Sequence, residues 1–598
     1  MSFFSRFSFL NPKAILSNRY VLLSLFLLAY SSIMESLGGL PSVLPAWRLE
    51  LPLLLYLFFY AGRITKQSRF QALAASAPVV LSYMFTDVFY IMFGRLPRFA
   101  EVTEVPELIH VASPGSIALF CVAAGLPLLG YLALLDFRRF RAMALGAVPL
   151  AALVLCVKFY PAFFMDAFER TQKGISFYSD SDSAGNNGRM SMMLYNEAKR
   201  RSYRSKITKW LDNNAFQNKF DRLVDKVKAV NAKRNVHLVV LESFVDPELM
   251  AKAQYSRKPA HPDYDAFFKD KVGLSVSPVF CGGTAQAEFE ALCGVPAMRE
   301  ISGVEFNAFT GARTFCAPNV LSRAGYHAIA TNSYSPDFFN SVNAYTGIGF
   351  SSIYYPREFA PGRDTYFSTG DTTGEKYMFD GDLFSQNLEF IARRIKENPD
   401  TPIFNYIVGI YGHIPIAINT DKRPKVVSVK SNSKDDVLEA TANQYYYRTE
   451  AIAAYVKGLL AIDPNSLIIL MSDHLPTLDF GPITYKELRY LDGSPESMYL
   501  NRILIVENGK PVKYDAIHHF SVPRIILNYV TNGSYCKEED CEFTSPKKKH
   551  LDREAYRDEY MAIMAHAMES EPPSSGAPSI VKASVERPGK DKGVSVAH

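Results

Sequence analysis

Five long apolar runs crowd the first 165 residues, and this crowding restricts the possible folds more than any other feature of the chain. The runs cover roughly residues 20–40, 50–62, 71–93, 113–135 and 142–162. A helix of about 20 apolar residues crosses the hydrocarbon core of a bilayer, and each run is near that length, although the second is short and the first contains Glu35. A single run would also suit a buried helix of a soluble protein. Five in succession predict a membrane anchor of five transmembrane helices over residues 1–165.

The basic residues around these runs predict the orientation of the anchor. On the side of the N-terminus the loops carry Arg6, Lys13, Arg19, Arg63, Lys66, Arg69, Arg138, Arg139 and Arg141. The opposite loops carry Arg48, Arg95 and Arg98, and three glutamates follow the last of these. The positive-inside rule therefore places the N-terminus in the cytoplasm and the chain after about residue 165 outside. The first run is not a cleavable signal peptide, because it has no small-residue cleavage site and four more runs follow it.

The rest of the chain divides into three parts. Residues 166–232 are polar and contain a Lys/Arg-rich helical pattern, typical either of an amphipathic helix on an anionic membrane surface or of a solvated linker helix. Over residues 233–565 short apolar strands alternate with amphipathic helices, which predicts an α/β domain with a largely parallel sheet. Residues 566–598 have the composition of a disordered tail. The net charge of +5 and the lack of a basic stripe with interleaved aromatic residues argue against nucleic-acid binding.

Polar residues stand at three places where a parallel α/β sheet positions its active site, namely after strands at their carboxyl ends. Glu242 follows the apolar stretch "NVHLVVL", and Asp473 and His474 follow "NSLIILMS". Gly282 and Gly283 allow a tight turn before Thr284, which can cap the helix "AQAEFEALCG". A hydroxyl at that position would face the positive end of the helix dipole and free backbone N–H groups, an arrangement that suits a phosphate.

The combination of these side chains predicts metal-assisted phosphoryl chemistry. Carboxylate and hydroxyl oxygens with one imidazole suit one divalent cation, and we expect Mn²⁺, with Mg²⁺ or Zn²⁺ as alternatives. The ion would lower the pKa of the threonine hydroxyl and offset charge on a bound phosphoryl group. Thr284 is a better candidate nucleophile than Cys281 or Cys293, because the sequence around the two thiols contains no evident base.

Six sequence blocks, in order, resemble the lipoteichoic acid synthase-type branch of the sulfatase/alkaline phosphatase superfamily. The blocks are "VVLESF", "GGTAQAEFEALCG", "GYHAIATNSYSPDFFNSVNAYTGIGF", "DGDLFSQNLEFI", "YIVGIYGHIPI" and "LIILMSDH", and they cover about residues 235–530. The resemblance implies a five-span membrane domain followed by a sulfatase/alkaline phosphatase-like α/β domain outside the membrane. It implies that the metal ligands are Glu242, Thr284, Asp473 and His474. It also makes Thr284 the nucleophile and His413 a contact of the substrate phosphate.

The reaction implied by the resemblance is transfer of a phospholipid head group. Threonine attacks the phosphorus of phosphatidylglycerol or phosphatidylethanolamine, diacylglycerol leaves, and the head group passes to a glycan or lipid acceptor. Where the family has a His, a Trp and an Arg that contact glycerol-phosphate, this chain has Asn332, Phe339 and Ser341. The loss of the Arg removes a bidentate phosphate clamp, so a single decoration of a periplasmic glucan, glycan or lipid is expected rather than polymerisation. The expected location is the bacterial inner membrane, multi-pass, with the catalytic domain in the periplasm.

Two other functions fit the same residues. A phosphodiesterase-type hydrolase would use water in place of the acceptor, and a catalytically inactive relative would bind lipid and regulate a partner. The presence of all four metal-site residues favours an enzyme. A true sulfatase is not expected, because "CAPNV" at Cys316 has Val320 in place of the arginine of the C-x-P-x-R signature.

The outer part of the chain has five cysteines. Cys536 and Cys541 lie close enough in sequence to form a small disulfide loop in an oxidising compartment. Cys281, Cys293 and Cys316 are expected to be structural, with two of them bridged. Since five is odd, at least one cysteine stays unpaired.

Overall fold

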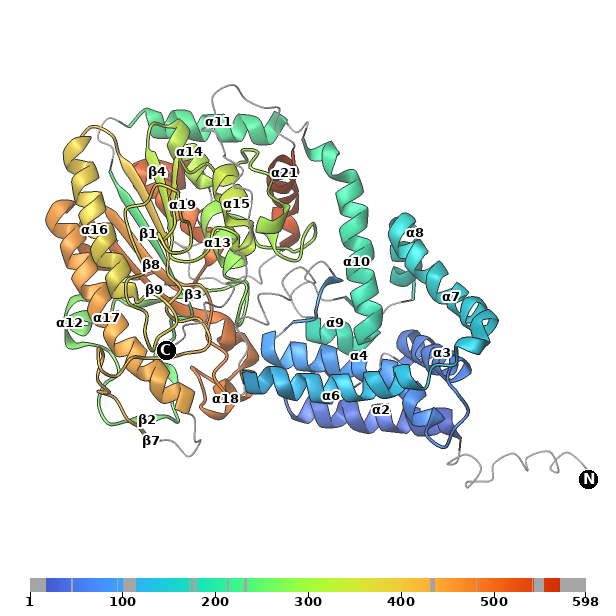
Figure 1. The fold of residues 1–598 in the computed structure, drawn as a ribbon. Helices are drawn as coiled ribbons and strands as arrows, with labels where there is room; N and C mark the ends of the chain where they lie inside the picture. The colour runs from blue at the N-terminus through green and yellow to red at the C-terminus, as the bar shows by residue number, and fades with distance from the viewer. Residues whose placement is uncertain are drawn as a thin grey trace, which may run out of the picture.

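The computed structural model describes residues 18–569, apart from 43, 45–46, 94, 100–113, 172–173, 176–179, 212–213, 231–233, 431–435, 480, 540 and 542–552. Its elements form a helical part and an α/β part, which lie side by side and are bridged by one long helix, α10 (Figure 1). Residues 566–598 are the predicted tail. Residues 566 and 567 belong to α21, and the part of the tail after residue 569 lies outside the described residues.

Each of the five apolar runs forms a helix. These are α2 (Arg19–Ser36), α3 (Trp47–Ile64), α4 (Gln71–Phe93), α6 (Pro114–Ala133) and α7 (Phe140–Phe159). Within the described ranges, two stretches are long and apolar enough to cross a bilayer, Gln71–Met92 and Phe137–Phe159, and Cys121–Ala133 is apolar but shorter. Charged residues partly explain why α3 is not among these stretches, since it includes Glu50 and Arg63. A five-span anchor therefore remains a prediction beyond these two stretches.

The residues after α7 connect the helical part to the α/β part. They form α8 (Pro161–Glu169), α9 (Asp180–Asn187), α10 (Arg189–Lys206) and α11 (Asn214–Lys228). α10 buries Met192, Tyr195 and Ala198; the juxtamembrane amphipathic helix or linker helix over residues 166–232 stays a prediction. α10 runs from the helical part up to the edge of the α/β part (Figure 1).

The α/β part is built on a nine-stranded sheet with the order β11-β3-β9-β8-β1-β6-β4-β5, and β10 pairs with β9. The strands are β1 (Val236–Leu241), β3 (Gly273–Val276), β4 (His327–Asn332), β5 (Ser352–Tyr354), β6 (Ile403–Val408), β8 (Leu467–Ser472), β9 (Leu500–Glu507), β10 (Lys510–Val512) and β11 (Ile517–His518). From β8 to β5 all neighbours are parallel, whereas β9 is antiparallel to β8 and β3. The predicted parallel sheet is thus confirmed at the centre. A separate small sheet pairs β2 (Gln254–Tyr255) with β7 (Val429–Lys430).

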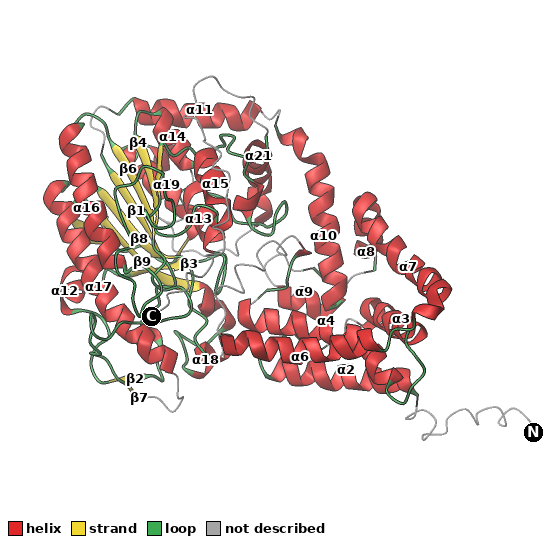
Figure 2. Ribbon diagram, in the orientation of Figure 1, coloured by secondary structure: helices red, strands yellow, loops and turns green. Residues whose placement is uncertain are grey.

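Helices cover both faces of the sheet (Figure 2). One face is covered by α12 (Pro262–Phe268), α16 (Asp380–Glu397) and α17 (Asp436–Ile462). The other is covered by α11, α13 (Thr284–Cys293), α14 (Ala317–Arg323), α15 (Ser341–Ile348), α19 (Val522–Val530) and α21 (Arg557–Ala567). Short helices α18 (Pro482–Glu487) and α20 (Tyr535–Glu538) complete this part. Successive residues of a strand face opposite sides, so Leu238 packs in one core and Val239 in the other, which explains why the β1 pattern is apolar throughout.

Two disulfides stabilise the α/β part. Cys293 pairs with Cys316, and Cys536 pairs with Cys541. Cys281 is a buried free cysteine. The predictions of a small loop, of one bridge among three structural cysteines and of one unpaired thiol are therefore confirmed.

Candidate active site

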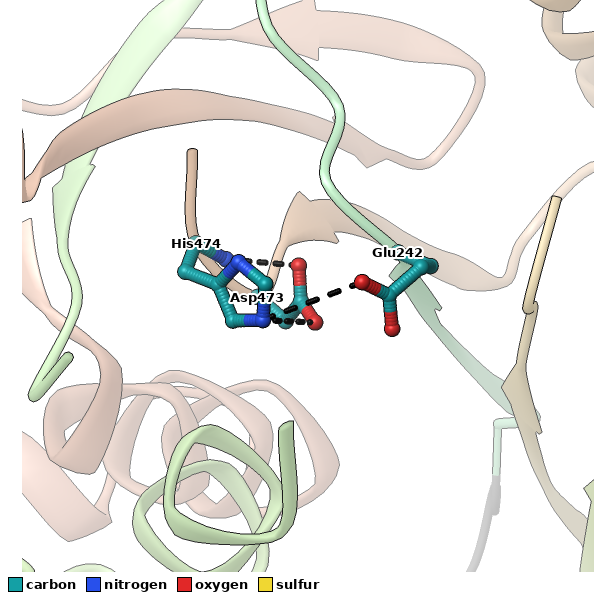
Figure 3. Close-up of side chains that lie close together, drawn as sticks. All are labelled: Glu242, Asp473 and His474. Atoms are coloured by element: carbon teal, nitrogen blue, oxygen red, sulfur yellow. Dashed lines mark hydrogen bonds and ion pairs between the residues drawn. The ribbon is translucent and has the colours of Figure 1, made fainter. Parts of the chain in front are cut away.

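The carboxyl ends of β1 and β8 bring three predicted metal ligands together. The two strands are parallel neighbours in which Leu241 is opposite Ser472, so the next residues, Glu242 and Asp473, lie side by side. One ligand atom from each of Glu242, Asp473 and His474 lies within 4.8 Å of the others. The side chains face one another (Figure 3), with His474 Nε2 3.2 Å from Asp473 Oδ2 and 3.7 Å from Glu242 Oε1.

Thr284 joins this cluster from the start of α13. Gly282 and Gly283 have φ of 78° and 87°, the left-handed region in which glycine has no steric penalty. Gly283 is the N-cap, and Thr284 is the first residue of the helix, without a capping hydrogen bond. The predicted capping role of Thr284 is therefore wrong, because its hydroxyl instead donates to Glu242 Oε2 at 3.0 Å.

The hydrogen bonds of His474 determine which ring nitrogen carries the proton. Nδ1 lies 3.0 Å from the Leu475 carbonyl oxygen, so Nδ1–H donates to it. Nε2 accepts the N–H of Gly282 at 3.0 Å. The unprotonated Nε2 therefore faces Asp473 Oδ2. These two atoms lie 3.2 Å apart, and each directs a lone pair toward the other.

The electrostatics of the cluster fit a divalent cation. Burial, followed by the charge of Glu242, raises the pKa of Asp473 to about 7. Asp473 Oδ2 is buried and has no hydrogen-bond partner among the described residues. An unpartnered buried oxygen, a neighbouring carboxylate and an imidazole lone pair that converge on one point are the donors that a cation would satisfy.

Two residues outside the predicted set hold Glu242 in place. Ser243 donates its hydroxyl to Glu242 Oε1 at 2.8 Å and its N–H to Asp473 Oδ1 at 2.7 Å. Arg448, from the middle of α17, donates to the Glu242 backbone carbonyl at 2.9 Å and pairs with Asp380 at 2.7 Å. No local sequence signal marks Arg448, because its partners lie 206 and 68 residues away along the chain.

A third unpredicted residue is Glu288, which lies one helical turn after Thr284 on α13. Its buried carboxyl accepts hydrogen bonds from Tyr345 at 2.5 Å and Tyr406 at 2.7 Å. Burial raises the pKa of Glu288 to about 7. The i, i+4 spacing from Thr284 was a signal that could have indicated it, since such residues share a helix face.

Of the four predicted substrate contacts, His413 lies in the loop after β6, Asn332 ends β4, and Phe339 and Ser341 lie in the segment after β4. His413 follows Gly412, where an added Cβ would come within 2.1 Å of the Glu242 carbonyl oxygen, so this loop passes close to Glu242. Asn332 ends β4 and is buried; its Oδ1 accepts the N–H of Tyr334 at 2.8 Å, and its Nδ2 donates to the Tyr345 hydroxyl at 3.1 Å.

Phe339 and Ser341 belong to the turn that leads into α15. Phe339 lies in a 3₁₀ turn, Phe338–Asn340, and has φ of 50°. Ser341 is buried, donates to the Pro336 carbonyl at 3.0 Å and lies 2.8 Å from the Tyr355 hydroxyl. These bonds hold the Ser341 hydroxyl within the protein. A contact of any of the four residues with substrate stays a prediction.

The thiol of Cys281 is a poor nucleophile in this structure. The side chain is buried, and burial, together with the charges of Glu242 and Asp473, raises the pKa of the thiol. Cys293 and Cys316 are joined in a disulfide and carry no free thiol. Among the residues of the turn before α13 and of α13 itself, Thr284 therefore stays the candidate nucleophile.

Comparisons with known proteins give the family of this part of the chain. Residues 234–522 match the sulfatase family model. A curated relative from Rhizobium meliloti (strain 1021), described as "Putative cyclic beta-1,2-glucan modification protein", is 25% identical over 268 residues, which are 44% of this chain and 38% of the relative. The chain thus matches less than half of that relative's length.

Solved structures with a distant likeness include three bacterial proteins. The Streptococcus pyogenes phosphoglycerol transferase GacH, in complex with sn-glycerol-1-phosphate, has a TM-score of 0.44 and 19% identity, over 59% of this chain and 91% of that one. The lipoteichoic acid synthase LtaP from Listeria monocytogenes has a TM-score of 0.40 and 18% identity, over 52% and 77%. The C-terminal periplasmic domain of EptC from Escherichia coli has a TM-score of 0.36 and 14% identity, over 54% and 89%. The match of residues 234–522 to the sulfatase family model agrees with the resemblance at the level of the superfamily.

Proposed function

We propose that this protein is a membrane-anchored, metal-dependent phosphotransferase of the bacterial periplasm. It transfers phosphoglycerol or phosphoethanolamine from a membrane phospholipid, through a phosphothreonine at Thr284, to a glucan, glycan or lipid acceptor. The observation that carries the proposal is the Thr284 hydroxyl, which lies at the start of α13 and 3.0 Å from Glu242 within a cluster of metal-ligand side chains.

The residues of the cluster have separate tasks in the proposed reaction. Glu242, Asp473, His474 and Thr284 would hold the divalent cation, Mn²⁺ first, which would offset negative charge on the phosphoryl group and lower the pKa of the threonine hydroxyl. Glu242 Oε2 accepts the hydrogen bond of that hydroxyl and so orients its oxygen. The backbone N–H groups at the start of α13 favour the negative phosphoryl oxygens.

The proposed transfer has two balanced steps. The Thr284 oxygen bonds to phosphorus, the bond from phosphorus to the diacylglycerol oxygen breaks, and the threonine proton ends on diacylglycerol. The acceptor hydroxyl then bonds to phosphorus, the bond to Thr284 breaks, and the acceptor proton returns to the threonine oxygen. Phosphoryl transfer of this kind needs mainly positioning and charge neutralisation.

Two observations support the location and the acceptor class. The stretches Gln71–Met92 and Phe137–Phe159 can cross a bilayer, and the distribution of Lys and Arg favours a periplasmic α/β domain. The curated relative is named for modification of a cyclic β-1,2-glucan, which supports a periplasmic glucan as the acceptor.

The test is intact-protein mass spectrometry of the full chain in detergent after incubation with Mn²⁺ and phosphatidylglycerol or phosphatidylethanolamine. The expected result is one head-group adduct on Thr284 with release of diacylglycerol, both lost on chelation with EDTA and restored by Mn²⁺. Thr284→Ala should lower diacylglycerol release by at least about a thousandfold, because it removes the nucleophile. Thr346→Ala, at an exposed threonine of α15, is the matched control and should keep full activity.

Other outcomes would replace this proposal with a different function. An adduct on Cys281, or normal turnover by Thr284→Ala, would contradict the threonine mechanism. Head-group release into water in the presence of acceptor would indicate a hydrolase. The absence of bound metal, adduct and diacylglycerol would indicate a lipid-binding protein without catalytic activity.

A further inference from the structure

Aromatic side chains border the active-site cluster on the side of β4 and β6. Tyr334 follows β4, and its ring centroid lies 5.2 Å from that of Phe338, 5.1 Å from that of Phe359 and 6.1 Å from that of Tyr377. Tyr377 in turn lies 5.4 Å from the ring of His413. We call these five residues the aromatic surface. Their contacts are edge-to-face, the arrangement that aromatic quadrupoles favour, so the rings support one another at fixed angles.

The aromatic surface is continuous with the proposed catalytic residues. The Tyr334 N–H donates to Asn332 Oδ1 at 2.8 Å, and His413 follows the loop residue that packs on the Glu242 carbonyl. Asn332 ends β4 and Glu242 follows β1, and one strand, β6, lies between them in the sheet. Since neighbouring strands are about 4.8 Å apart, the aromatic surface begins roughly 10 Å from the metal-ligand cluster.

Phe359 is the exposed member of this surface. Its side chain is 38% exposed, and it is the single large hydrophobic residue that is exposed in the described part of residues 180–569. Its position is held by the neighbouring Glu358, whose carboxylate accepts the Ser368 hydroxyl at 2.5 Å and the Thr369 N–H at 2.8 Å. An ordered, solvent-facing phenyl ring beside an active site is a typical element of a ligand-binding surface.

The chemistry of the surface favours a carbohydrate over a lipid chain. A sugar ring has one face of C–H groups, which packs on an aromatic ring, and a rim of hydroxyls, which needs polar partners. The aromatic surface has polar atoms among its rings: Tyr377 is buried, and its hydroxyl donates to the Ile414 carbonyl at 3.0 Å and lies 3.3 Å from Nδ1 of the half-buried His413 imidazole. An acyl chain would instead require a continuous apolar lining without such polar groups.

We propose that the aromatic surface is the acceptor subsite and that Phe359 stacks on a sugar ring of a carbohydrate acceptor. The inference rests on the proposed function, because it assigns the acceptor of the second transfer step. An oligosaccharide bound there would have one sugar ring on Phe359 and would present a hydroxyl of another sugar unit, nearer the cluster, to phosphothreonine 284. The hydroxyl oxygen bonds to phosphorus, the bond from phosphorus to the Thr284 oxygen breaks, and the hydroxyl proton passes to that oxygen.

The experiment compares Phe359→Ala and Phe359→Trp with the unaltered full chain in detergent. The probe is a β-linked gluco-oligosaccharide, and glycerol, which has no ring to stack, is the second acceptor. We expect Phe359→Ala to raise the KM for the oligosaccharide about three- to tenfold with little change in kcat, and Phe359→Trp to restore it. Transfer to glycerol should show no such rise. Phe70→Ala, at a 51% exposed phenylalanine of the helical part, is the matched control.

A calorimetric titration with the oligosaccharide separates this inference from the proposed function. If no adduct forms on Thr284 but the oligosaccharide binds and Phe359→Ala weakens that binding, the transfer mechanism fails and the carbohydrate subsite stands. If the adduct forms but the oligosaccharide neither binds nor accepts the head group, the carbohydrate subsite is wrong. An equal loss for glycerol and oligosaccharide, or a loss in adduct formation as large as the loss in transfer, would also overturn it.

Discussion

Glu288 connects the nucleophile helix to the neighbouring strands through one buried carboxyl group. Tyr406 on β6 and Tyr345 on α15 both donate to it, and the Tyr345 hydroxyl also accepts a hydrogen bond from Asn332 at the end of β4. Because α13 carries both Thr284 and Glu288, this network sets the position of the proposed nucleophile, Thr284, relative to β4 and β6. A buried network of this kind stabilises a fold only while every member has its partner.

The pKa of Glu288 makes part of the stability depend on pH. The carboxyl has an ordinary pKa of 4.5 in the unfolded chain, and burial raises it to about 7 in the fold. Between these values the folded state binds more protons than the unfolded state, so stability is fully present below about pH 4.5 and falls as pH rises through about 7. We expect Glu288→Gln, whose amide oxygen can accept the same tyrosine hydrogen bonds, to show a smaller decrease in Tm between pH 4.5 and 7.5.

Thermal unfolding of the two proteins over this pH range measures the effect. The pKa of Asp473 is also raised, and the charge of Asp473 contributes to the raised pKa of Glu288, so the difference between the two curves reports Glu288 together with this coupling. Parallel curves would show that Glu288 does not titrate in this range.

At the scale of secondary structure, the site residues at the ends of strands could be predicted from the sequence, whereas the residues that hold them in place could not. Continuous apolar stretches followed by Glu242 or by Asp473 and His474 are local patterns, and a parallel sheet brings such residues to one edge. The adjacency of β1 and β8 depends on pairing between segments more than 200 residues apart. The Arg448 contact to Glu242 has the same origin, because it comes from the middle of a helix whose own pattern indicates only packing.

The error about Thr284 was a matter of one residue. Two glycines in left-handed conformations allow Gly283 to take the N-cap position, which moves Thr284 into the first turn of α13. Sequence patterns locate helix ends only to within one or two residues. This shift directs the hydroxyl to Glu242 instead of to the backbone of its own helix.

The two disulfides should differ in their contributions to stability. Cys293–Cys316 joins the end of α13 to the start of α14 across 23 residues, whereas Cys536–Cys541 closes a loop of 5 residues. Loop-closure entropy gives about 3 kcal/mol for the first bridge and about 2 kcal/mol for the second. We expect Cys293→Ala/Cys316→Ala to lower the free energy of unfolding in urea more than Cys536→Ala/Cys541→Ala. Removal of both partners prevents new pairing with Cys281, and the reverse order of the two variants would contradict the prediction.

In the molecule as a whole, α10 links the helical part to the α/β part at both of its ends (Figure 1). At its start Glu50 of α3 accepts the N–H groups of Met190 at 3.3 Å and Ser191 at 3.2 Å, and a carboxylate there complements the helix dipole. In its second half Lys199 pairs with Glu300 of the α/β part at 2.8 Å. The 18 residues of α10 make a spacer of about 27 Å. The two parts also pack directly on each other, since Ile483 lies next to Gly38 and Gly481 next to the Ile91 carbonyl, so α10 contributes to how the α/β part stands relative to the helical part.

A buried ion pair holds the first residue of α10 against the helical part. The Arg189 guanidinium, 1% exposed, pairs with Asp87 of α4 at 2.8 Å and donates to the carbonyls of Leu40 and Pro41 at 3.2 Å. Loss of one partner leaves a buried charge uncompensated, which typically costs about 3–5 kcal/mol. Asp87→Ala should therefore loosen α10 from the helical part while the α/β part keeps its own two cores.

We expect Asp87→Ala to lower activity on a donor in a membrane more than activity on a donor in solution. In Asp87→Ala, the proposed turnover of phospholipid in vesicles should fall about tenfold or more, because α10 would no longer hold the candidate active site in position relative to the proposed membrane anchor. Turnover of a water-soluble glycerophosphodiester should stay close to normal, because the Thr284 site is unaltered. Asp87→Ala/Arg189→Met removes both charges and should recover part of the loss. Asp166→Ala breaks an exposed pair with Arg170 and serves as the control. Equal losses on both donors would mean that the ion pair stabilises the fold as a whole and does not position the active site.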